Sequence, residues 1–263
     1  MHVRPFGKIL GQITDGLLQA QQGLHHLIWP ASCMNCHASV SQDDNLLCKD
    51  CWRELLSCTG GDYCPACGCD VSAYAILEGA CPGCWDRSFL FDGIIRCGVY
   101  TKCLAKMVLG FKKDRTELGH VLGPLVKSAF EGSPVHARVD LLVPVPLHWT
   151  RRLTRGYNQA HVIARTLRGA HTGICGALKR KRRTPYQPTV ATYPARYRNV
   201  KGAFSVCRES AVSGRCICLV DDVKTSGATL NECAKALKLA GAKEVYALVL
   251  AVAGQTLSQG KRI

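Results

Sequence analysis

The sequence has 263 residues, of which 47% are hydrophobic and 20% charged, and its formal net charge is +15. This composition is typical of a soluble globular protein and excludes an intrinsically disordered chain. The length allows one full α/β domain together with a smaller module. No apolar run approaches the roughly 18 residues that a membrane helix requires, so we expect no insertion into a membrane.

Residues 1–31 are expected to form an N-terminal amphipathic helix over roughly 9–27, with Ile13, Leu17, Leu18 and Leu24 on or near one face. Polar residues and glycine interrupt this stretch, so it has no continuous apolar segment of the kind that an export signal contains. We therefore expect a cytoplasmic protein in a reducing compartment.

Residues 32–90 predict a small cysteine-rich module. The chain has 17 cysteines, and eight of them form four CxxC pairs before residue 85. The segment has few aliphatic residues, and a segment of about 60 residues with so small a core usually needs a crosslink. The pairs are Cys33/Cys36, Cys48/Cys51, Cys64/Cys67 and Cys81/Cys84.

Two such pairs supply the four thiolates of a closed tetrahedral zinc site, and zinc binding would supply the folding free energy that the core lacks. A redox dithiol is the alternative for one isolated pair, but four pairs within 52 residues favour one or two structural zinc ions. Other ligand pairings stay open, because Cys58, Cys69 and His37 are spare ligands. A closed site has no open coordination position, so we expect no metal catalysis there.

Residues 91–263 alternate strand-like apolar runs with helical patterns. This alternation predicts an α/β domain with a mostly parallel sheet and flanking helices. Gly241 marks the end of the last helix, because glycine is common directly after a helix C-terminus. The expected strands are 93–100, 139–145, 216–220 and 243–251, and the expected helices are 104–110, 117–130, 158–167 and 228–240.

The strongest chemical signal is the segment 217–229, with the sequence ICLVDDVKTSGAT. Four apolar residues form a buried strand, Asp221 and Asp222 follow at its carboxyl end, and a Thr/Ser/Gly loop then opens into a helix. Ligands of open α/β sheets bind at this edge, and the backbone N–H groups of such a loop bind anions. Adjacent carboxylates can accept hydrogen bonds from a sugar diol and help to hold a divalent ion. The alternative is an acidic cap on an ordinary strand–helix turn.

Positive charge is concentrated between Arg151 and Arg215, where 15 Lys or Arg residues accompany one acid, Glu209. Such a block predicts a polyanionic ligand, either the phosphates of a small molecule or a nucleic acid backbone. The run Lys179–Arg183 is expected in a flexible loop, and a solvated basic hairpin is the alternative. Four tyrosines lie among these bases and could stack on nucleobases or simply pack, namely Tyr157, Tyr186, Tyr193 and Tyr197. For any single basic residue, a solvated surface charge is the alternative.

The segment 217–229 resembles the PRPP motif of type I phosphoribosyltransferases, enzymes that bind 5-phosphoribosyl 1-diphosphate (PRPP). The resemblance implies that Asp221 and Asp222 hold the ribose hydroxyls and that Mg²⁺ accompanies PRPP. It also implies that the loop binds the 5′-phosphate through Thr225, Ser226, Gly227, Ala228 and Thr229.

A second set of motifs resembles the ComF/GntX family of phosphoribosyltransferase-like proteins, which are associated with DNA uptake or DNA utilisation. It comprises VPVPLH at 143–148, RGYNQA at 155–160 and RNVKGAF at 198–204, behind the paired cysteine motifs. This resemblance implies a type I phosphoribosyltransferase-like fold preceded by a double zinc ribbon. It implies single-stranded DNA and a DNA-uptake helicase as partners.

The same resemblance places Val145, Pro146 and Arg151 near the pyrophosphate of PRPP. An ordinary strand end is the alternative for the two prolines of VPVP, because proline removes a backbone donor and ends ladder pairing. Candidate contacts to DNA or phosphate are Lys112, Arg152, Arg155, Arg183 and Arg198.

Two functions fit these residues. One is Mg²⁺-dependent transfer of the phosphoribosyl group from PRPP to an acceptor that the sequence does not identify. The other is a non-catalytic protein that binds single-stranded DNA and reuses the fold. A thiol-based redox or metal sensor is a weaker third hypothesis, because it requires reactive cysteines. No Ser/His/Asp or Cys/His constellation is evident, so no catalytic residue is assigned.

Overall fold

The computed structural model describes residues 31–40, 46–72, 75–84, 89–113, 115–169, 172–184 and 192–253. The helix predicted within residues 1–31 lies outside the described residues. The chain forms two compact units that divide between Glu54 and Leu55, and each unit contains four of the paired cysteines. Among the described residues, no helix is long and apolar enough to cross a membrane.

The described part of the smaller unit is a tight turn followed by a helix. The amide of Cys33 donates a hydrogen bond to the carbonyl of Ala38 at 2.8 Å, which closes the turn. His37 adopts the left-handed conformation, with φ of 62°, and this lets the chain reverse within the turn. Helix α2 (Lys49–Ser57) begins in this unit. Cys48 lies just before the helix and Cys51 lies within it, and their thiols are close to those of Cys33 and Cys36 in the turn.

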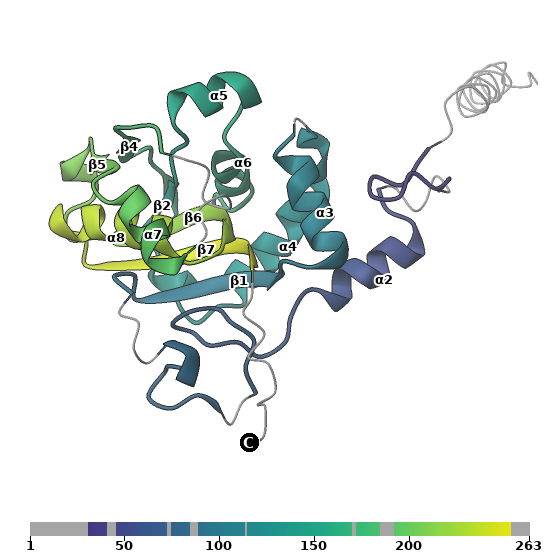
Figure 1. The fold of residues 1–263 in the computed structure, drawn as a ribbon, viewed down its shortest axis with the longest axis horizontal. Coiled ribbons are helices and arrows are strands. Elements are labelled where there is room, and N and C mark those ends of the chain that lie inside the picture. The colour runs from purple at the N-terminus through teal and green to yellow at the C-terminus, as the bar shows by residue number, and fades with distance from the viewer. Residues whose placement is uncertain are drawn as a thin grey trace, which may run out of the picture. The chain divides into compact units, whose positions relative to one another are not determined.

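The larger unit is built on a five-stranded sheet in which every strand is parallel to its neighbours (Figure 1). The strand order is β1-β7-β6-β2-β3, and β6 and β7 are buried along most of their length. The predicted parallel sheet with flanking helices is therefore confirmed. The strands are β1 (Gly93–Val99), β2 (Leu141–Pro144), β3 (Gly173–Ile174), β6 (Cys216–Lys224) and β7 (Glu244–Val252).

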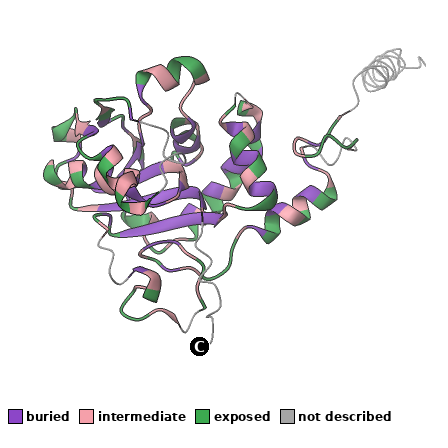
Figure 2. Cartoon of the chain, in the orientation of Figure 1, coloured by how far each residue is buried: buried purple, intermediate pink, exposed green. Residues whose placement is uncertain are grey.

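Helices cover both faces of this sheet. Successive side chains of a strand point to opposite faces, so strands that are apolar at every position have two apolar faces to bury. Ile217 and Leu219 of β6 share one core with Leu237 of α8, while Cys218 and Val220, which point the other way, are also fully buried. Figure 2 shows the strands of the sheet coloured largely as buried. Helix α4 packs against β1 and β7, and α6 packs against β2 and β6. These helices are α3 (Lys102–Phe111), α4 (Gly119–Glu131), α6 (Gln159–Thr166) and α8 (Ala228–Leu239).

Several short elements are not predicted by the sequence patterns. Helix α5 (Trp149–Arg155) follows β2, and β4 (Leu178–Arg180) pairs antiparallel with β5 (Phe204–Val206). The expectation of a flexible loop over 179–183 is therefore wrong for Lys179 and Arg180, because strand pairing fixes them. The remaining helical elements are α7 (Tyr193–Val200) and the 3₁₀ turns Pro82–Cys84, Thr116–Leu118, His136–Arg138 and Glu209–Ala211.

The segment 58–70 covers the outer edge of β1. The amide of Val99 donates to the carbonyl of Cys58 at 2.9 Å, and the amide of Ile94 donates to the carbonyl of Pro65 at 2.8 Å. Because β1 is the terminal strand in the sheet order, these bonds pair groups that the sheet itself leaves open. The second half of the cysteine-rich segment therefore folds as part of the larger unit.

Candidate functional site

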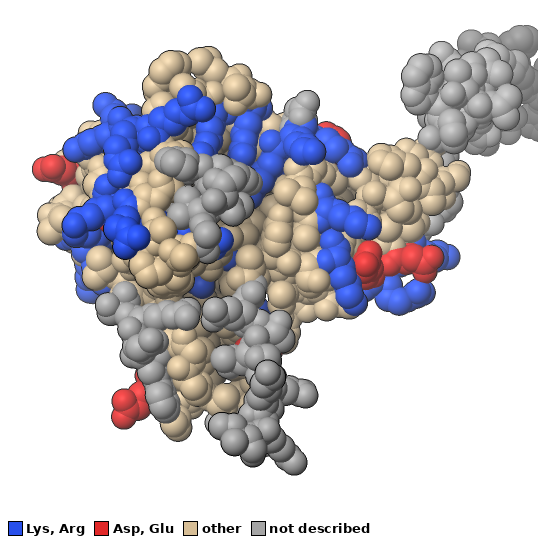
Figure 3. All heavy atoms as spheres, in the orientation of Figure 1, with Lys and Arg blue, Asp and Glu red and all other residues tan. Residues whose placement is uncertain are grey.

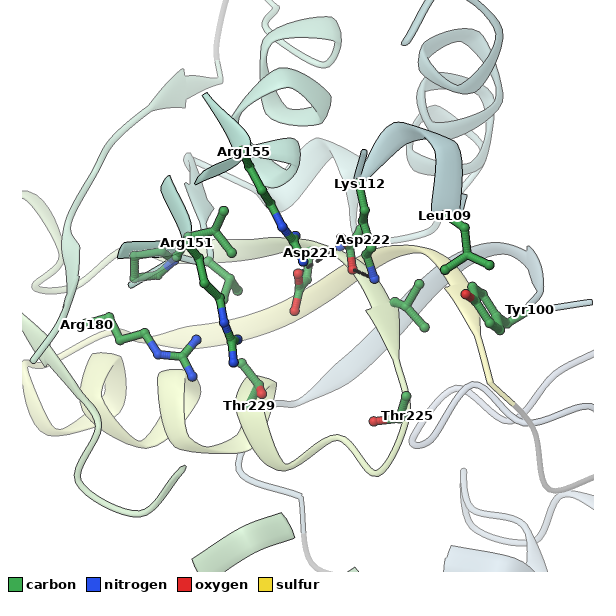
Figure 4. A pocket seen from close by; sticks show the side chains of 14 residues that line it. Tyr100, Leu109, Lys112, Arg151, Arg155, Arg180, Asp221, Asp222, Thr225 and Thr229 are labelled. Atoms are coloured by element: carbon green, nitrogen blue, oxygen red, sulfur yellow. Dashed lines mark hydrogen bonds and ion pairs between the residues drawn. The ribbon is translucent and has the colours of Figure 1, made fainter. Parts of the chain in front are cut away.

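A pocket of about 400 Å³ opens at the carboxyl ends of β2 and β6. The amide of Val145, directly after β2, donates to the carbonyl of Val220 at 2.9 Å, and β6 continues to Lys224, so Asp221 and Asp222 lie within β6 and not, as predicted, after its end. Open parallel sheets bind their ligands at the carboxyl ends of their strands. The pocket is lined by Tyr100, Leu109, Lys112, Val145, Pro146, Leu147, Arg151, Arg155, Arg180, Asp221, Asp222, Val223, Thr225 and Thr229 (Figure 4).

Two adjacent carboxylates lie in the pocket wall. Asp222 forms an ion pair with Lys112, with 2.9 Å between Oδ1 and Nζ. Burial raises the pKa of the Asp221 carboxyl to about 7, and the neighbouring charge of Asp222 adds to this shift. The backbone amide of Asp222, which donates to Asp221 at 2.9 Å, and the charges of Lys112 and Arg180 offset the shift only in part. A hydroxyl donor or a cation in the pocket would therefore stabilise the ionised form of Asp221.

The loop after β6 has the geometry of an anion site. Gly227 has the left-handed φ of 81°, and a Cβ there would lie 3.2 Å from Lys224 and from Phe89, so only glycine fits without strain. Helix α8 begins at the next residue, and the Ser226 hydroxyl accepts a hydrogen bond from the Ala228 amide at 3.3 Å. The residues at this helix start line a small hollow together with Asp221, and the unpaired N–H groups of a helix start favour an anion.

Three arginines reach the pocket, and two of them share one anchor. Arg151, from α5, donates to the Thr184 carbonyl at 3.0 Å, and Arg180, from β4, donates to the Thr184 hydroxyl. Burial lowers the pKa of Arg180, and the charge of Arg151 lowers it further. Among the described residues, the buried Nε atom of Arg180 has no hydrogen-bond partner. Figure 4 shows both guanidinium groups on the Thr229 side of the pocket, an arrangement that favours a bound anion.

Two side chains of the RGYNQA segment hold the end of α3, which forms the Lys112 side of the pocket. The Tyr157 hydroxyl and the Gln159 side-chain amide both donate to the carbonyl of Phe111, and the Tyr157 ring packs edge-on against the Phe111 ring. These bonds hold the end of α3, where the next residue, Lys112, pairs with Asp222. Tyr157 therefore has a packing role, which was the alternative to base stacking.

The eight CxxC cysteines form two clusters, and in each cluster the four sulfur atoms lie within 4.8 Å of one another. The sulfurs of Cys36 and Cys48 are 3.6 Å apart, and those of Cys64 and Cys84 are 3.7 Å apart. A disulfide bond is about 2 Å long, whereas sulfurs that surround tetrahedral zinc at about 2.3 Å are about 3.8 Å from one another. The donor type and spacing therefore fit a metal ion. The clusters, as predicted, are Cys33, Cys36, Cys48 and Cys51, and Cys64, Cys67, Cys81 and Cys84.

Several bacterial proteins align with most of this chain, although no protein-family model matches it. The chain is 29% identical to competence protein F of Haemophilus influenzae, over 83% of this chain and 96% of that protein. It is 28% identical to competence protein ComFC of Bacillus subtilis, over 83% and 92%, and 29% identical to DNA utilization protein YhgH of Escherichia coli, over 82% and 94%. The chain is a homologue of these ComF and GntX proteins.

Among solved structures, this ComF homologue is weakly similar to glutamine PRPP amidotransferase from B. subtilis in complex with ADP and GMP. The TM-score is 0.34 and the sequence identity 20%, over 50% of this chain and 26% of that one. A similarity of this size carries no argument about the ligand or the activity.

The pocket of this ComF homologue gathers most of the residues expected to bind PRPP or phosphate. Those that line the pocket are Lys112, Val145, Pro146, Arg151, Arg155, Asp221, Asp222, Thr225 and Thr229. Those that line the adjoining hollow include Ser226, Gly227 and Ala228. Three candidates are exposed and lie outside the pocket lining, namely Arg152, Arg183 and Arg198.

The sequence patterns do not mark Arg180 and its anchor Thr184 as site residues, nor the pocket residues Tyr100, Leu109 and Val223. Arg180 is one of five consecutive basic residues, and only the pairing of β4 with β5 distinguishes it from its exposed neighbours. Tyr100 follows β1, Leu109 lies on α3 and Val223 lies within β6. Core packing is the ordinary interpretation at such positions, so no local signal marks them.

Proposed function

We propose that this pocket binds PRPP together with Mg²⁺. The observation that carries the proposal is that an acidic pair, an anion-binding loop and an anchored arginine pair converge on one pocket. PRPP offers the matching groups, which are a ribose diol, a 5′-phosphate and a diphosphate. The homologous competence and DNA-utilization proteins favour a role of this ligand site in DNA uptake or utilisation.

Each group of PRPP has a counterpart in the pocket. The ribose hydroxyls would donate to the carboxylates of Asp221 and Asp222, and the 5′-phosphate would accept from the backbone amides of the loop 225–229. The diphosphate would bind the guanidinium groups of Arg151 and Arg180, whose planar donors match phosphate oxygens. The loop supplies the amides and Thr184 supplies the rigidity that holds both guanidinium groups.

The carboxylates also fit Mg²⁺, because this ion prefers oxygen ligands and binds through one or two carboxylates plus substrate phosphates. When bound, it would neutralise negative charge on the diphosphate. If transfer occurs, the bond from ribose C1 to the diphosphate breaks, a bond from C1 to the acceptor forms, and pyrophosphate leaves with the electron pair. Arg151 and Arg180 would stabilise the charge that develops on this leaving group.

Calorimetric titration of the zinc-loaded protein with PRPP and Mg²⁺ tests this proposal. We expect saturable binding with an affinity that rises from about pH 6 to about pH 8. The direction of this change follows from Asp221. In the ligand-free protein the pKa of its carboxyl is about 7. Ribose hydroxyls favour the ionised form, so protonation at lower pH competes with binding.

The Asp221→Asn variant is the control for this pH dependence. A phosphate group also titrates near pH 6, so the variant retains the contribution of the ligand and loses that of Asp221. Equal pH dependence in the variant and the wild type would contradict the placement of the ribose. An absence of saturable PRPP binding at any pH in this range would overturn the proposal itself.

We also infer that each cysteine cluster holds one structural zinc ion. A set of four thiolates at tetrahedral spacing is typical of closed zinc sites, which stabilise small folds and leave no position for a substrate. A count of two zinc atoms per chain by elemental analysis would support this inference.

Single-stranded DNA is a second candidate ligand, and one surface favours it. Trp149 and Leu153, one turn apart on α5, are 65% and 74% exposed, and the exposed Arg152 lies between them. The Trp149 ring lies 5.6 Å from that of His148, whose pKa is lowered by burial and by nearby arginines that include Arg183. Figure 3 shows that Lys and Arg side chains gather over this part of the molecule. An exposed aromatic ring among cations suits a stacked base beside its phosphates. The helicase partner stays a prediction of the family resemblance.

Binding of a fluorescent single-stranded oligonucleotide at about 50 to 200 mM salt tests this candidate. We expect affinity to fall steeply with salt, and Trp149→Ala to weaken binding about tenfold through the loss of stacking. Arg152→Ala is expected to reduce the salt dependence by about one phosphate contact, whereas Lys127→Ala, an exposed control on α4, is not. Salt-independent binding, or equal effects of both cation variants, would exclude this surface as the DNA site.

A further inference from the structure

Phe89 lies between the second cysteine cluster and the core of the larger unit. Its half-buried ring packs against the cluster of Cys64, Cys67, Cys81 and Cys84, and it also packs against the main hydrophobic core. The ring stacks on that of Phe91, with the centroids 4.8 Å apart. One side chain therefore contacts both the candidate metal site and the sheet core.

The same ring contacts the anion-binding loop. A Cβ at Gly227 would lie 3.2 Å from the Phe89 ring, so the ring occupies the space beneath the loop at its left-handed residue. The ammonium of Lys224 lies 5.6 Å from the ring centroid, within the range of a cation–π contact. The amide of Leu90 donates to the Asn231 side chain at 2.6 Å, which ties this segment to the first turn of α8.

We propose that Phe89 is a positioning residue that couples metal binding at the second cysteine cluster to anion binding at the loop 225–229. The metal holds the cysteines against which the ring packs, and the ring supports the loop. Loss of the metal releases the ring and loosens the loop. By thermodynamic linkage, an anion on the loop raises the metal affinity of the second cluster by the same factor by which the metal strengthens anion binding. The identity of the anion, PRPP, rests on the proposed function, whereas the coupling rests on packing.

The first cysteine cluster provides an internal control for this coupling. Its four ligands belong to the smaller unit, which is compact by itself. In the described part of the chain, the cysteine cluster against which Phe89 packs is the second one. The proposal therefore predicts that a ligand on the loop protects the second metal site and leaves the first unchanged.

Hydrogen exchange followed by mass spectrometry on the full chain tests the coupling without any ligand. A zinc-selective chelator is added to the zinc-loaded protein, and exchange is measured in a peptide that covers residues 224–230. We expect exchange there to become about fivefold faster or more, while peptides of β7 remain protected. An unchanged loop in protein whose second cluster has lost its metal would overturn the proposal.

Two variants make this result specific. Phe89→Leu removes the ring beneath Gly227, so the loop is expected to exchange fast before any chelator is added, and chelation adds little. Phe91→Leu replaces the neighbouring ring by a smaller apolar side chain and is expected to retain the response to chelation. If chelation also exposes β7, the zinc-loaded Phe89→Leu protein decides, because a slow loop in that variant contradicts the proposal.

Peptide-resolved alkylation of the cysteines, in the presence of the chelator, measures the reverse effect. PRPP with Mg²⁺ is expected to slow alkylation of the second cluster about fivefold and leave the first cluster unaffected. If calorimetry shows PRPP binding but this rate does not change, the coupling is wrong and the proposed function stands. If calorimetry shows no PRPP binding, the proposed function fails, and the exchange of the loop on chelation still decides the coupling.

Discussion

Replacement of both Asp221 and Asp222 by asparagine is expected to weaken binding of PRPP by about 100-fold or more. Each carboxylate would lose a charge-assisted hydrogen bond to the ribose, and two such bonds together are worth about 3 kcal/mol or more. The change is measured by calorimetry at fixed pH and Mg²⁺ concentration. Inorganic pyrophosphate serves as the matched ligand, because it has no ribose.

The contrast between PRPP and pyrophosphate shows whether the acidic pair binds the ribose or only contributes negative charge to the pocket. Without Mg²⁺, removal of two negative charges makes the pocket more positive, so pyrophosphate is expected to bind the double variant at least as tightly as the wild type. PRPP that also gains affinity would show that the carboxylates do not contact the diol. The Arg152→Ala variant, whose side chain lies outside the pocket, is expected to bind PRPP normally.

The double variant should keep its fold, because its two changes have opposite effects on stability. Burial raises the pKa of Asp221 to about 7, so the ligand-free protein loses stability as the pH rises from about 4, the pKa of the unfolded side chain, to about 7, and asparagine removes this loss. Asp222→Asn removes the ion pair with Lys112, which is largely shielded from solvent, and is expected to cost about 1 kcal/mol or somewhat more. The melting temperature measures the balance and is expected to change little.

The two cysteine clusters are expected to differ sharply in what they stabilise. Cys67→Ser, in the second cluster, is expected to lower the melting temperature of the larger unit by about 10 °C or more, because structural zinc supplies several kcal/mol of folding free energy. Cys36→Ser, at the equivalent position of the first cluster, should leave that transition in place, because its cluster belongs to the smaller unit. Thermal unfolding of the larger unit is measured as the loss of resistance to protease in β6 and β7 as the temperature rises, which distinguishes the two units.

Zinc content is the control for both cysteine variants. Each substitution should remove one zinc ion per chain, so the variants differ in stability but not in stoichiometry. Equal destabilisation of β6 and β7 by Cys36→Ser and Cys67→Ser would show that the two units unfold together. No destabilisation by either variant would mean that the hydrogen bonds of segment 58–70 to β1 hold without metal.

The long strands and helices could be predicted because each carries a sustained pattern. The run 217–220 and the helix from Ala228 both appear in the structure at the expected place, as do the strands near 93 and 244. Strands β3 and β4, of two and three residues, are too short to show periodicity, and tertiary pairing alone defines them. Helix α5 has only seven residues and ends at Arg155, before the left-handed Gly156, and its arginines and exposed apolar residues hide any amphipathic pattern.

The site shows the same division between local and tertiary signals. Asp221 and the loop around Gly227 belong to one short continuous segment, so their roles can be predicted from the sequence alone. Arg180 reaches the pocket only because β4 pairs with β5, and Phe89 reaches Gly227 across more than a hundred residues. The sequence indicates a single cysteine-rich module, whereas the division between the units depends on the hydrogen bonds that join its second half to β1.

The cover over β1 has a consequence for how the chain survives in a cell short of zinc. Segment 58–70 occupies the row of backbone groups that a terminal strand would otherwise offer to another molecule. A chain that lacks metal at its second cluster would present this strand bare, and bare strands pair with one another between molecules. Newly made protein awaiting its metal would then be lost to edge-to-edge aggregation, so metal supply would limit the yield of soluble protein before it limited any activity.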